Sequence, residues 1–218
     1  MAYSYDKREV SHGNQFGFFA KISSNEAGEI EFGTPYEFTG LRATSFATTQ
    51  ESNPYYADNV EHVRLMGAKT TEGSITTYQI KKQFMIDHLG KKETTATPPA
   101  LIDTGVQSNF LWCYSETITD QFGGELNEWH IWTNVQASAG VTSDTATDEE
   151  SVEPKEIEIP LTASPNTGIQ DSDGKAVTEI VWRDNADGTV KALVDSLFSD
   201  TEPMEVSEFL DTALGKTA

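Results

Sequence analysis

Cysteine is nearly absent from this 218-residue chain, since Cys113 is the only one. A single cysteine excludes an intrachain disulfide and any metal site built from several thiolates. Histidine is scarce as well: His12, His62, His88 and His130 lie far apart in the sequence, and none has the spacing of a histidine metal motif. The stability of the fold must therefore come from its hydrophobic core.

Basic side chains are also few, with 15 Lys and Arg against 35 Asp and Glu, so the formal net charge is −20. Binding to nucleic-acid phosphates or to an anionic membrane surface depends on clustered Lys and Arg, and both are therefore disfavoured. The imbalance is concentrated after residue 110, and no Lys or Arg lies between Lys92 and Lys155. This acidity fits either a solvated surface that keeps the protein soluble or a surface that repels a polyanion.

Long hydrophobic runs are missing too. No stretch of about 18 apolar residues occurs, which excludes a transmembrane helix. The first seven residues lack the apolar core of a secretion signal, so we expect the chain to fold in the cytoplasm.

Threonine, by contrast, is abundant, and short alternating runs are separated by Gly, Pro, Asn and Asp, as is typical of β strands. The run 110–114 is apolar on both faces, which predicts a central strand covered on both sides, and Gly123-Gly124 predicts a hairpin turn after it. In the run 156–161, Pro160 predicts a position at a sheet edge or near the end of a strand. The expected strands are 16–23, 41–49, 70–79, 110–114, 129–135, 156–161 and 178–182.

Three helices are expected. Their apolar residues recur with helical spacing over 81–89, 192–198 and 203–214, and Gly90 and Gly215 follow two of them as helix-ending residues. The sequence therefore predicts a mainly β domain over residues 1–200, with a flexible loop at 138–154 and a helical C-terminal extension at 201–218.

Signs of catalysis are weak. Cys113 and His130 lie on adjacent predicted strands and form the one candidate nucleophile and base, although a buried thiol near a histidine is the commoner arrangement. Neither a Gly-x-Ser-x-Gly motif nor a phosphate-binding Gly-rich loop occurs. We therefore expect an assembly or binding module, and no catalytic or cofactor site.

Two Asp-rich segments have spacings that calcium can use. Asp171 and Asp173 belong to the first, Asp184 and Asp187 to the second, but neither segment continues to a closing Glu. Asp-rich turns at strand ends explain them without a metal.

The aromatic residues leave a further choice. Trp112, Tyr114, Trp129 and Trp132 fit either a hydrophobic core or the face of a carbohydrate- or receptor-binding β-sandwich.

Two segments resemble a known family. They are FGTPYEFTGL at 32–41 and NPYYADN at 53–59, followed by the Thr-rich run 70–79 and a short helix that ends in Leu89-Gly90. In this order the pieces resemble the major tail tube proteins of long-tailed bacteriophages that infect Gram-positive hosts. The runs 17–22 and 112–114 also resemble the opening strand and the central strand of that family.

The resemblance implies a β-sandwich or split barrel of antiparallel strands flanked by one short helix. Copies would form hexameric rings that stack into the tail tube of the virion, through which double-stranded DNA passes from capsid to host without specific binding. It implies tape measure, tail terminator and distal tail proteins as partners, and assembly in the host cytoplasm. The expected assembly turn contains Tyr55, Tyr56, Asp58 and Asn59, and the candidate acids of the channel are Glu61, Glu72 and Glu116.

Overall fold

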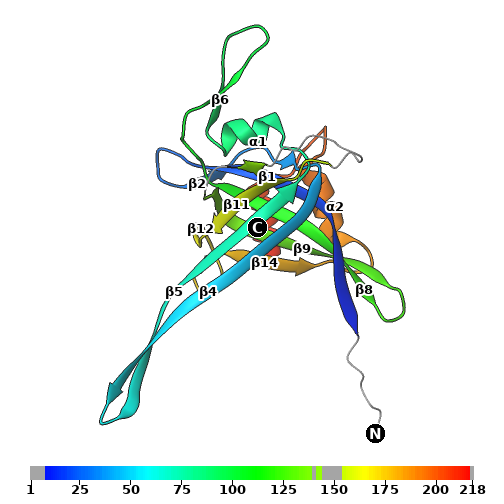
Figure 1. The fold of residues 1–218 in the computed structure, drawn as a ribbon. Helices are drawn as coiled ribbons and strands as arrows, with labels where there is room; N and C mark the ends of the chain where they lie inside the picture. Colours follow the sequence, from blue (N-terminus) through cyan, green and yellow to red (C-terminus); the bar gives the residue numbers. More distant parts are fainter. Residues whose placement is uncertain (1–7, 139–140, 144–153, 217–218) are drawn as a thin grey trace, which may run out of the picture.

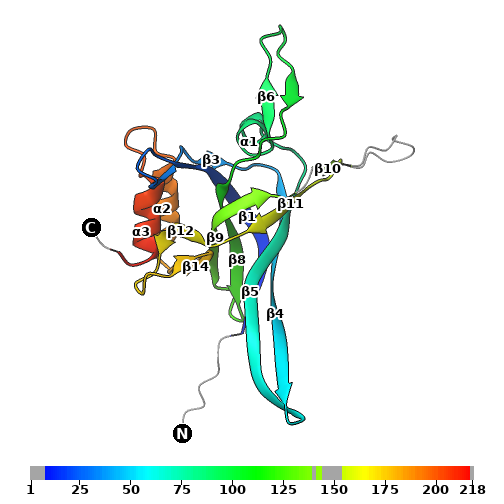
Figure 2. The same cartoon turned by 90° about the vertical axis from the view of Figure 1, so that its left-hand side faces the viewer.

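A computed structural model describes residues 8–138, 141–143 and 154–216. The fold is mainly β, with 54% of the described residues in strands and 12% in helices, as the sequence predicts (Figures 1 and 2). None of the helices in these residues is long and apolar enough to cross a membrane. The predicted flexible loop at 138–154 lies largely outside the described residues.

Ten strands form one antiparallel sheet in the order β2-β1-β8-β9-β11-β5-β4, with β3, β10 and β14 paired to β1, β11 and β9. Two small hairpins, β6-β7 and β12-β13, complete the described strands. The bounds are β1 Glu9–Ser24, β2 Ile30–Phe32, β3 Tyr36–Glu37, β4 Leu41–Ala57, β5 Val60–Thr77, β6 Lys91–Glu93, β7 Leu101–Asp103, β8 Phe110–Asp120, β9 Glu125–Ala137, β10 Thr142–Ser143, β11 Ile157–Ala163, β12 Asn166–Gln170, β13 Ala176–Val177 and β14 Glu179–Arg183.

The hairpin β4-β5 is much longer than the sequence predicts. Its strands were expected to end at Thr49 and to begin again at Thr70, but both continue to a two-residue turn at Asp58 and Asn59. The φ angles of these two residues are 52° and 64°, the conformation of a type I′ turn, which Asp and Asn tolerate. The far half of the hairpin extends beyond the body of the molecule (Figure 1).

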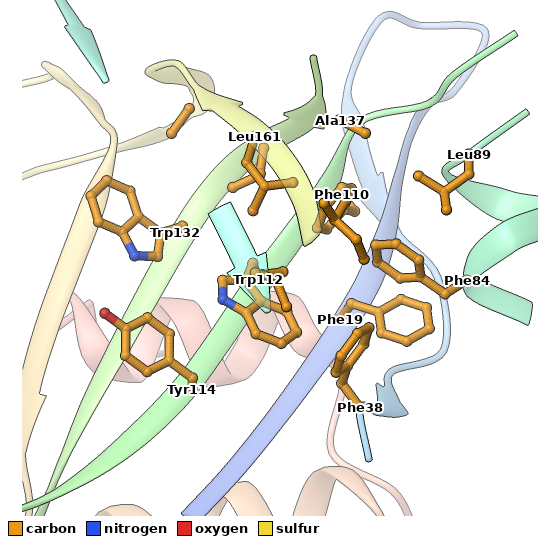
Figure 3. Close-up of a cluster of buried hydrophobic side chains, with 14 residues drawn as sticks. Phe19, Phe38, Phe84, Leu89, Phe110, Trp112, Tyr114, Trp132, Ala137 and Leu161 are labelled. Carbon is orange, nitrogen blue, oxygen red and sulfur yellow. The ribbon is translucent and has the colours of Figure 1, made fainter. Parts of the chain in front are cut away.

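The sheet curls so that β4, β5 and β11 lie across β8 and β9 (Figure 1). A first hydrophobic cluster fills the space between these two layers, and the helix α1 (Lys82–Asp87) adds Phe84 to it. Figure 3 shows the rings of Phe19, Phe38, Phe84 and Trp112 packed together here. The predicted helix at 81–89 is confirmed.

The opposite face of β1, β8 and β9 is covered by α2 (Thr189–Leu197) and α3 (Val206–Ala213), as Figure 2 shows. A second hydrophobic cluster lies between these helices and the strands, and Phe209 of α3 is fully buried in it. Strand β8 is therefore covered on both faces, and its first six residues are all buried. The prediction of a central strand at 110–114 is confirmed.

The prediction that Pro160 marks an edge or strand end is wrong. It lies in the middle of β11, between β5 and β9. The carbonyl of Pro160 accepts a hydrogen bond from Ser138, directly after the last residue of β9. The two residues of a hydrogen-bonded antiparallel pair normally exchange two bonds, and Pro160 has no N–H to donate back to Ser138. The ladder between β11 and β9 therefore ends at this pair, while β11 continues along β5.

The start of α2 depends on one buried carboxylate. Asp184 is 6% exposed, and its oxygens accept hydrogen bonds from the backbone N–H groups of Asn185, Val190 and Lys191 at 2.9–3.0 Å. Amides at a helix start have no partner within the helix, so this carboxylate supplies one.

We predict that Asp184→Ala lowers the free energy of unfolding by about 2–3 kcal/mol, because it leaves buried amide donors without an acceptor. Asp187→Ala, which removes an exposed carboxylate three residues later, is the matched control and should change it by less than about 0.5 kcal/mol. Urea unfolding of the dilute proteins measures both. Equal values for the two variants would contradict the capping role.

Candidate assembly surfaces

The far half of the β4-β5 hairpin, residues 50–69, is called the hairpin tip here. It carries large apolar side chains with exposed fractions of 46–68%: Tyr55, Tyr56, Val60, Val63, Leu65 and Met66. Soluble monomers rarely expose apolar patches of this kind unless they bind a partner. The predicted assembly residues Tyr55 and Tyr56 lie within this patch, and Asp58 and Asn59 form its turn.

The two faces of the hairpin tip differ: one is apolar, and the other mixes apolar residues with the ion pair of Glu61 and Arg64. On one face Tyr55 lies opposite Val63, with Leu65 two residues away, and on the other face Met66 lies opposite Ser52. A ribbon buried against its own body would show apolar residues on one face only. The exposed apolar face of Tyr55, Val63 and Leu65 is therefore covered by no part of the described chain.

Glu61, one of the candidate channel acids, also lies on the hairpin tip. Its carboxylate forms a two-point ion pair with the guanidinium of Arg64, at 2.8 and 2.9 Å. The hydrogen bonds from Arg64 lower the pKa of Glu61. Glu61 is thus an exposed acid whose charge is already balanced by a neighbour.

A second surface lies on the body of the sheet. The residues of β4, β5 and β11 that point away from the first hydrophobic cluster form what we call the polar sheet face: Ala43, Ser45, Ala47, Thr49, Thr70, Glu72, Ser74, Thr76, Glu158, Pro160 and Thr162. No Lys or Arg occurs in the stretches 43–49, 70–76 and 157–163. The charged residues within these stretches, Glu72 and Glu158, are acidic, and Arg42 at the start of β4 is paired with Glu156. Glu72 was predicted as a channel acid; Glu158 was not.

The polar sheet face ends at an open edge. Strand β4 is 17 residues long and, within the described residues, its backbone pairs with β5 on one side alone. A long unpaired edge presents a row of free N–H and C=O groups that a strand of another chain can take up. The edge, the polar sheet face and the hairpin tip belong to the same two strands.

Glu116, the third candidate acid, lies elsewhere. It is on β8, on the inner face of the sheet, where its carboxylate accepts a hydrogen bond from the hydroxyl of Ser11. Nearby, the Nδ1 atom of His130 is 3.2 Å from a carboxylate oxygen of Glu179, and its Nε2 atom is 3.7 Å from one of Glu128. Burial lowers the pKa of His130, but the surrounding carboxylates raise it more, so the net shift is upward.

Cys113 and His130 do not form a catalytic pair. Cys113 lies opposite Ile131 and points into the second hydrophobic cluster, whereas His130 lies opposite Tyr114 and stacks on its ring on the other face of the sheet. Successive residues of a strand point to opposite faces, so the sheet itself separates the two groups. Burial raises the pKa of the Cys113 thiol well above its usual value. The nucleophile hypothesis is contradicted.

The tryptophans belong to the core. Trp112, Trp129 and Trp132 are 0%, 3% and 4% exposed, and Phe46 stacks on Trp132 at a centroid distance of 4.0 Å. A sugar-binding platform needs an accessible aromatic face, which these three residues do not offer.

The Asp-rich segments act as turns in this structure. Asp171 accepts hydrogen bonds from the backbone N–H groups of Asp173 and Lys175, and Asp184 caps α2. Within the part of the chain that the structure describes, no three His, Cys, Asp or Glu side chains are grouped as a metal site would require.

His88 is the second histidine with a shifted pKa. It is fully buried in the first cluster, where its ring lies 4.6–5.3 Å from the ring centroids of Phe19, Phe84 and Phe110. Burial among these rings disfavours the charged form and lowers the pKa of His88 to about 4, although Asp87 opposes the shift.

This shift predicts a pH dependence. An unfolded histidine has a pKa near 6.5, so below that pH the unfolded state binds a proton that the native state does not. The free energy of unfolding should therefore fall as the pH drops from about 6.5 towards 4, by about 3 kcal/mol in all. His88→Phe should remove this contribution, whereas the exposed His62→Gln should keep it. Urea unfolding of dilute protein at pH 4.5–7.5 measures the difference, and parallel curves for His88→Phe and the unmodified chain would contradict it.

A comparison with protein-family models places these surfaces in context. The model described as phage tail tube protein matches residues 1–204 of the chain. The chain belongs to this family. No curated protein matches it. The match covers every described element up to the end of α2, and it ends just before α3.

Membership confirms the predicted resemblance. Tail tube proteins are structural proteins, so this tail tube protein is a component of the phage virion that assembles with itself and with other tail proteins into a tube. The sequence indicated the turn of the hairpin but missed the length of its strands, and Glu158 was not singled out. The alternation of Glu156 and Glu158 with Ile157 and Ile159 was the available signal for the outward position of Glu158.

Proposed function

We propose that copies of this tail tube protein close into hexameric rings, and that the rings stack into a tube whose channel carries double-stranded DNA from capsid to host. The observation that carries this proposal is the open 17-residue edge of β4 beside a polar sheet face without basic residues. The number of six subunits comes from the family resemblance.

Ring closure is supported by the strand edge. A sheet with a long exposed edge risks uncontrolled pairing unless the edge is covered, and a closed ring covers every such edge with a neighbouring subunit. Pairing along β4 would extend the β4-β5-β11 layer from one subunit to the next. The inner wall of the ring would then be a continuous sheet.

The polar sheet face is the surface that we place toward the channel, with Glu72 and Glu158 as its acids. Lys and Arg contacts to phosphates release counterions and add affinity, so a wall without them lets DNA slide. Salt at physiological concentration screens charges over about 8 Å. Acids near the channel therefore have the largest effect on DNA, and the net charge of −20 by itself has little effect. Glu61 and Glu116 lie away from this face, on the hairpin tip and among the half-buried carboxylates around His130.

The remaining parts of the proposal follow from the family. We infer assembly in the host cytoplasm, a tape measure protein inside the growing tube, a terminator and a distal tail protein at its ends, and no enzymatic activity. The carbohydrate-binding alternative lacks support, because its aromatic residues are buried.

The test is self-assembly of the purified chain. Concentrated protein, with no DNA or other tail protein added, should form rings and tubes that negative-stain microscopy shows and that sediment far faster than a monomer. A folded protein that stays monomeric at every concentration and salt would contradict the proposal.

A further inference from the structure

A second hairpin, residues 90–106, projects from the body and is called the arm here. Its strands β6 and β7 pair with each other, and no other described strand pairs with them. The base is firmly held: the backbone N–H and the hydroxyl of Thr104 both donate to the carbonyl of Gly90, at 2.8 and 2.6 Å. Ion pairs of Lys91 with Asp103 and of Lys82 on α1 with Glu93 add to this. The arm therefore has a fixed direction.

That direction is opposite to the direction of the hairpin tip. In both views the arm rises from one end of the molecule beside α1, and the hairpin tip extends from the other end (Figures 1 and 2). When identical subunits stack head to tail along an axis, the two ends of each subunit meet and must fit each other. The arm and the hairpin tip are the elements that project furthest toward the contact between stacked subunits (Figures 1 and 2).

The arm carries three exposed apolar side chains. Leu101, Ile102 and Val106 are 37%, 49% and 71% exposed. A two-stranded hairpin with no covered face is only marginally stable in water, so such a ribbon gains from packing against another surface. Lys92, which lies opposite Ile102, forms no ion pair within the described residues.

We propose that the arm of one copy packs against the hairpin tip of a second copy in the next ring, with Ile102 on the apolar face formed by Tyr55, Val63 and Leu65. This inference rests on the proposed stacking of rings. Ile102 and the hairpin tip both offer exposed apolar side chains. The charges are complementary as well: Lys92 beside Ile102 is basic, whereas Glu51 and Asp58 on the hairpin tip are exposed acids that form no ion pair within the described residues.

A matched pair of substitutions tests the contact. Ile102→Asp places a charge at the proposed contact, while Thr95→Asp places the same charge in the loop between β6 and β7. Ile102→Asp should raise the protein concentration needed for tubes at least tenfold and leave single rings intact. Thr95→Asp should leave tube formation unchanged. Equal tube formation by Ile102→Asp and the unmodified chain would overturn the inference.

Cross-linking locates the contact directly. A chain with both Ile102→Cys and Val63→Cys cannot bridge itself, because the two positions lie at opposite ends of the molecule, and the native Cys113 is buried. Mild oxidation of its tubes should give a ladder of covalent oligomers on a non-reducing gel, and each single variant should give at most dimers. Tubes without a ladder would overturn the arm contact and leave the tube function intact. If the unmodified chain forms no tubes, the proposed function fails and this inference fails with it.

Discussion

Replacing residues 50–69 by the two residues Asp-Asn is expected to abolish tube formation while the body stays folded. Thr49 lies opposite Thr70, just as Ala57 lies opposite Val60 across the native turn, so the shortened hairpin can close with the same two-residue turn. The deletion removes the exposed apolar side chains of the hairpin tip and none of the buried core. At about 1.5–3 kcal/mol for each apolar side chain that assembly buries, the association constant should fall roughly a thousandfold or more.

Sedimentation and negative-stain microscopy measure the loss of tubes, and thermal unfolding of the dilute protein measures the stability of the body. The matched control changes only Asp58-Asn59 to Asn-Gly, which keeps the type I′ turn and the full length of the hairpin. This control should form tubes normally. Normal tube formation by the shortened chain would contradict the role of the hairpin tip.

Replacing Glu72 and Glu158 together by Lys should turn the channel from a surface that DNA passes into one that holds it. Each copy changes by four charge units, and all of the new cations lie on the polar sheet face. Since each phosphate contact made by a Lys lowers the salt-dependent free energy of binding, the retained DNA should increase by at least about a hundredfold at roughly 0.1 M salt and should fall steeply as salt is raised.

DNA that is added during assembly and then protected from nuclease measures retention inside the tube. The control carries Glu26→Lys and Glu202→Lys, two exposed acids in turns outside the polar sheet face, and has the same net charge. It should protect no more DNA than the unmodified chain. Equal protection by the two variants would show that net charge matters and the face does not, and would contradict the placement of the channel.

The elements that the sequence predicted correctly are those whose pattern is set within the subunit. Strand β8 is apolar on both faces because two hydrophobic clusters cover it, and α1 shows one apolar face because it packs on one cluster. Residues 50–69 gave no such pattern. Neither face of that ribbon is buried in the monomer, so apolar and polar residues do not alternate, and the strands were expected to stop at Thr49.

The position of Pro160 was mispredicted for a different reason. A proline excludes a ladder bond at its own nitrogen, but the sequence does not reveal where the neighbouring strand ends, and β9 ends next to it. The candidate acids show the same limit. Glu61, Glu72 and Glu116 all lie on or near predicted strands. The fold nevertheless places them on the hairpin tip, on the polar sheet face and in a half-buried cluster. The direction of the chain and the order of strands in the sheet decide which surface an acid occupies, and a short stretch of sequence reveals neither.

The central claim is that β4 and β5 build the wall of a channel. A cryo-electron microscopy reconstruction of tubes formed by the unmodified chain tests it most directly. We predict a continuous inner sheet in which the free edge of β4 pairs with a strand of the neighbouring subunit, and in which Glu72 and Glu158 point into the channel. A reconstruction with the β4 edge unpaired, or with the polar sheet face on the outside of the tube, would contradict the account.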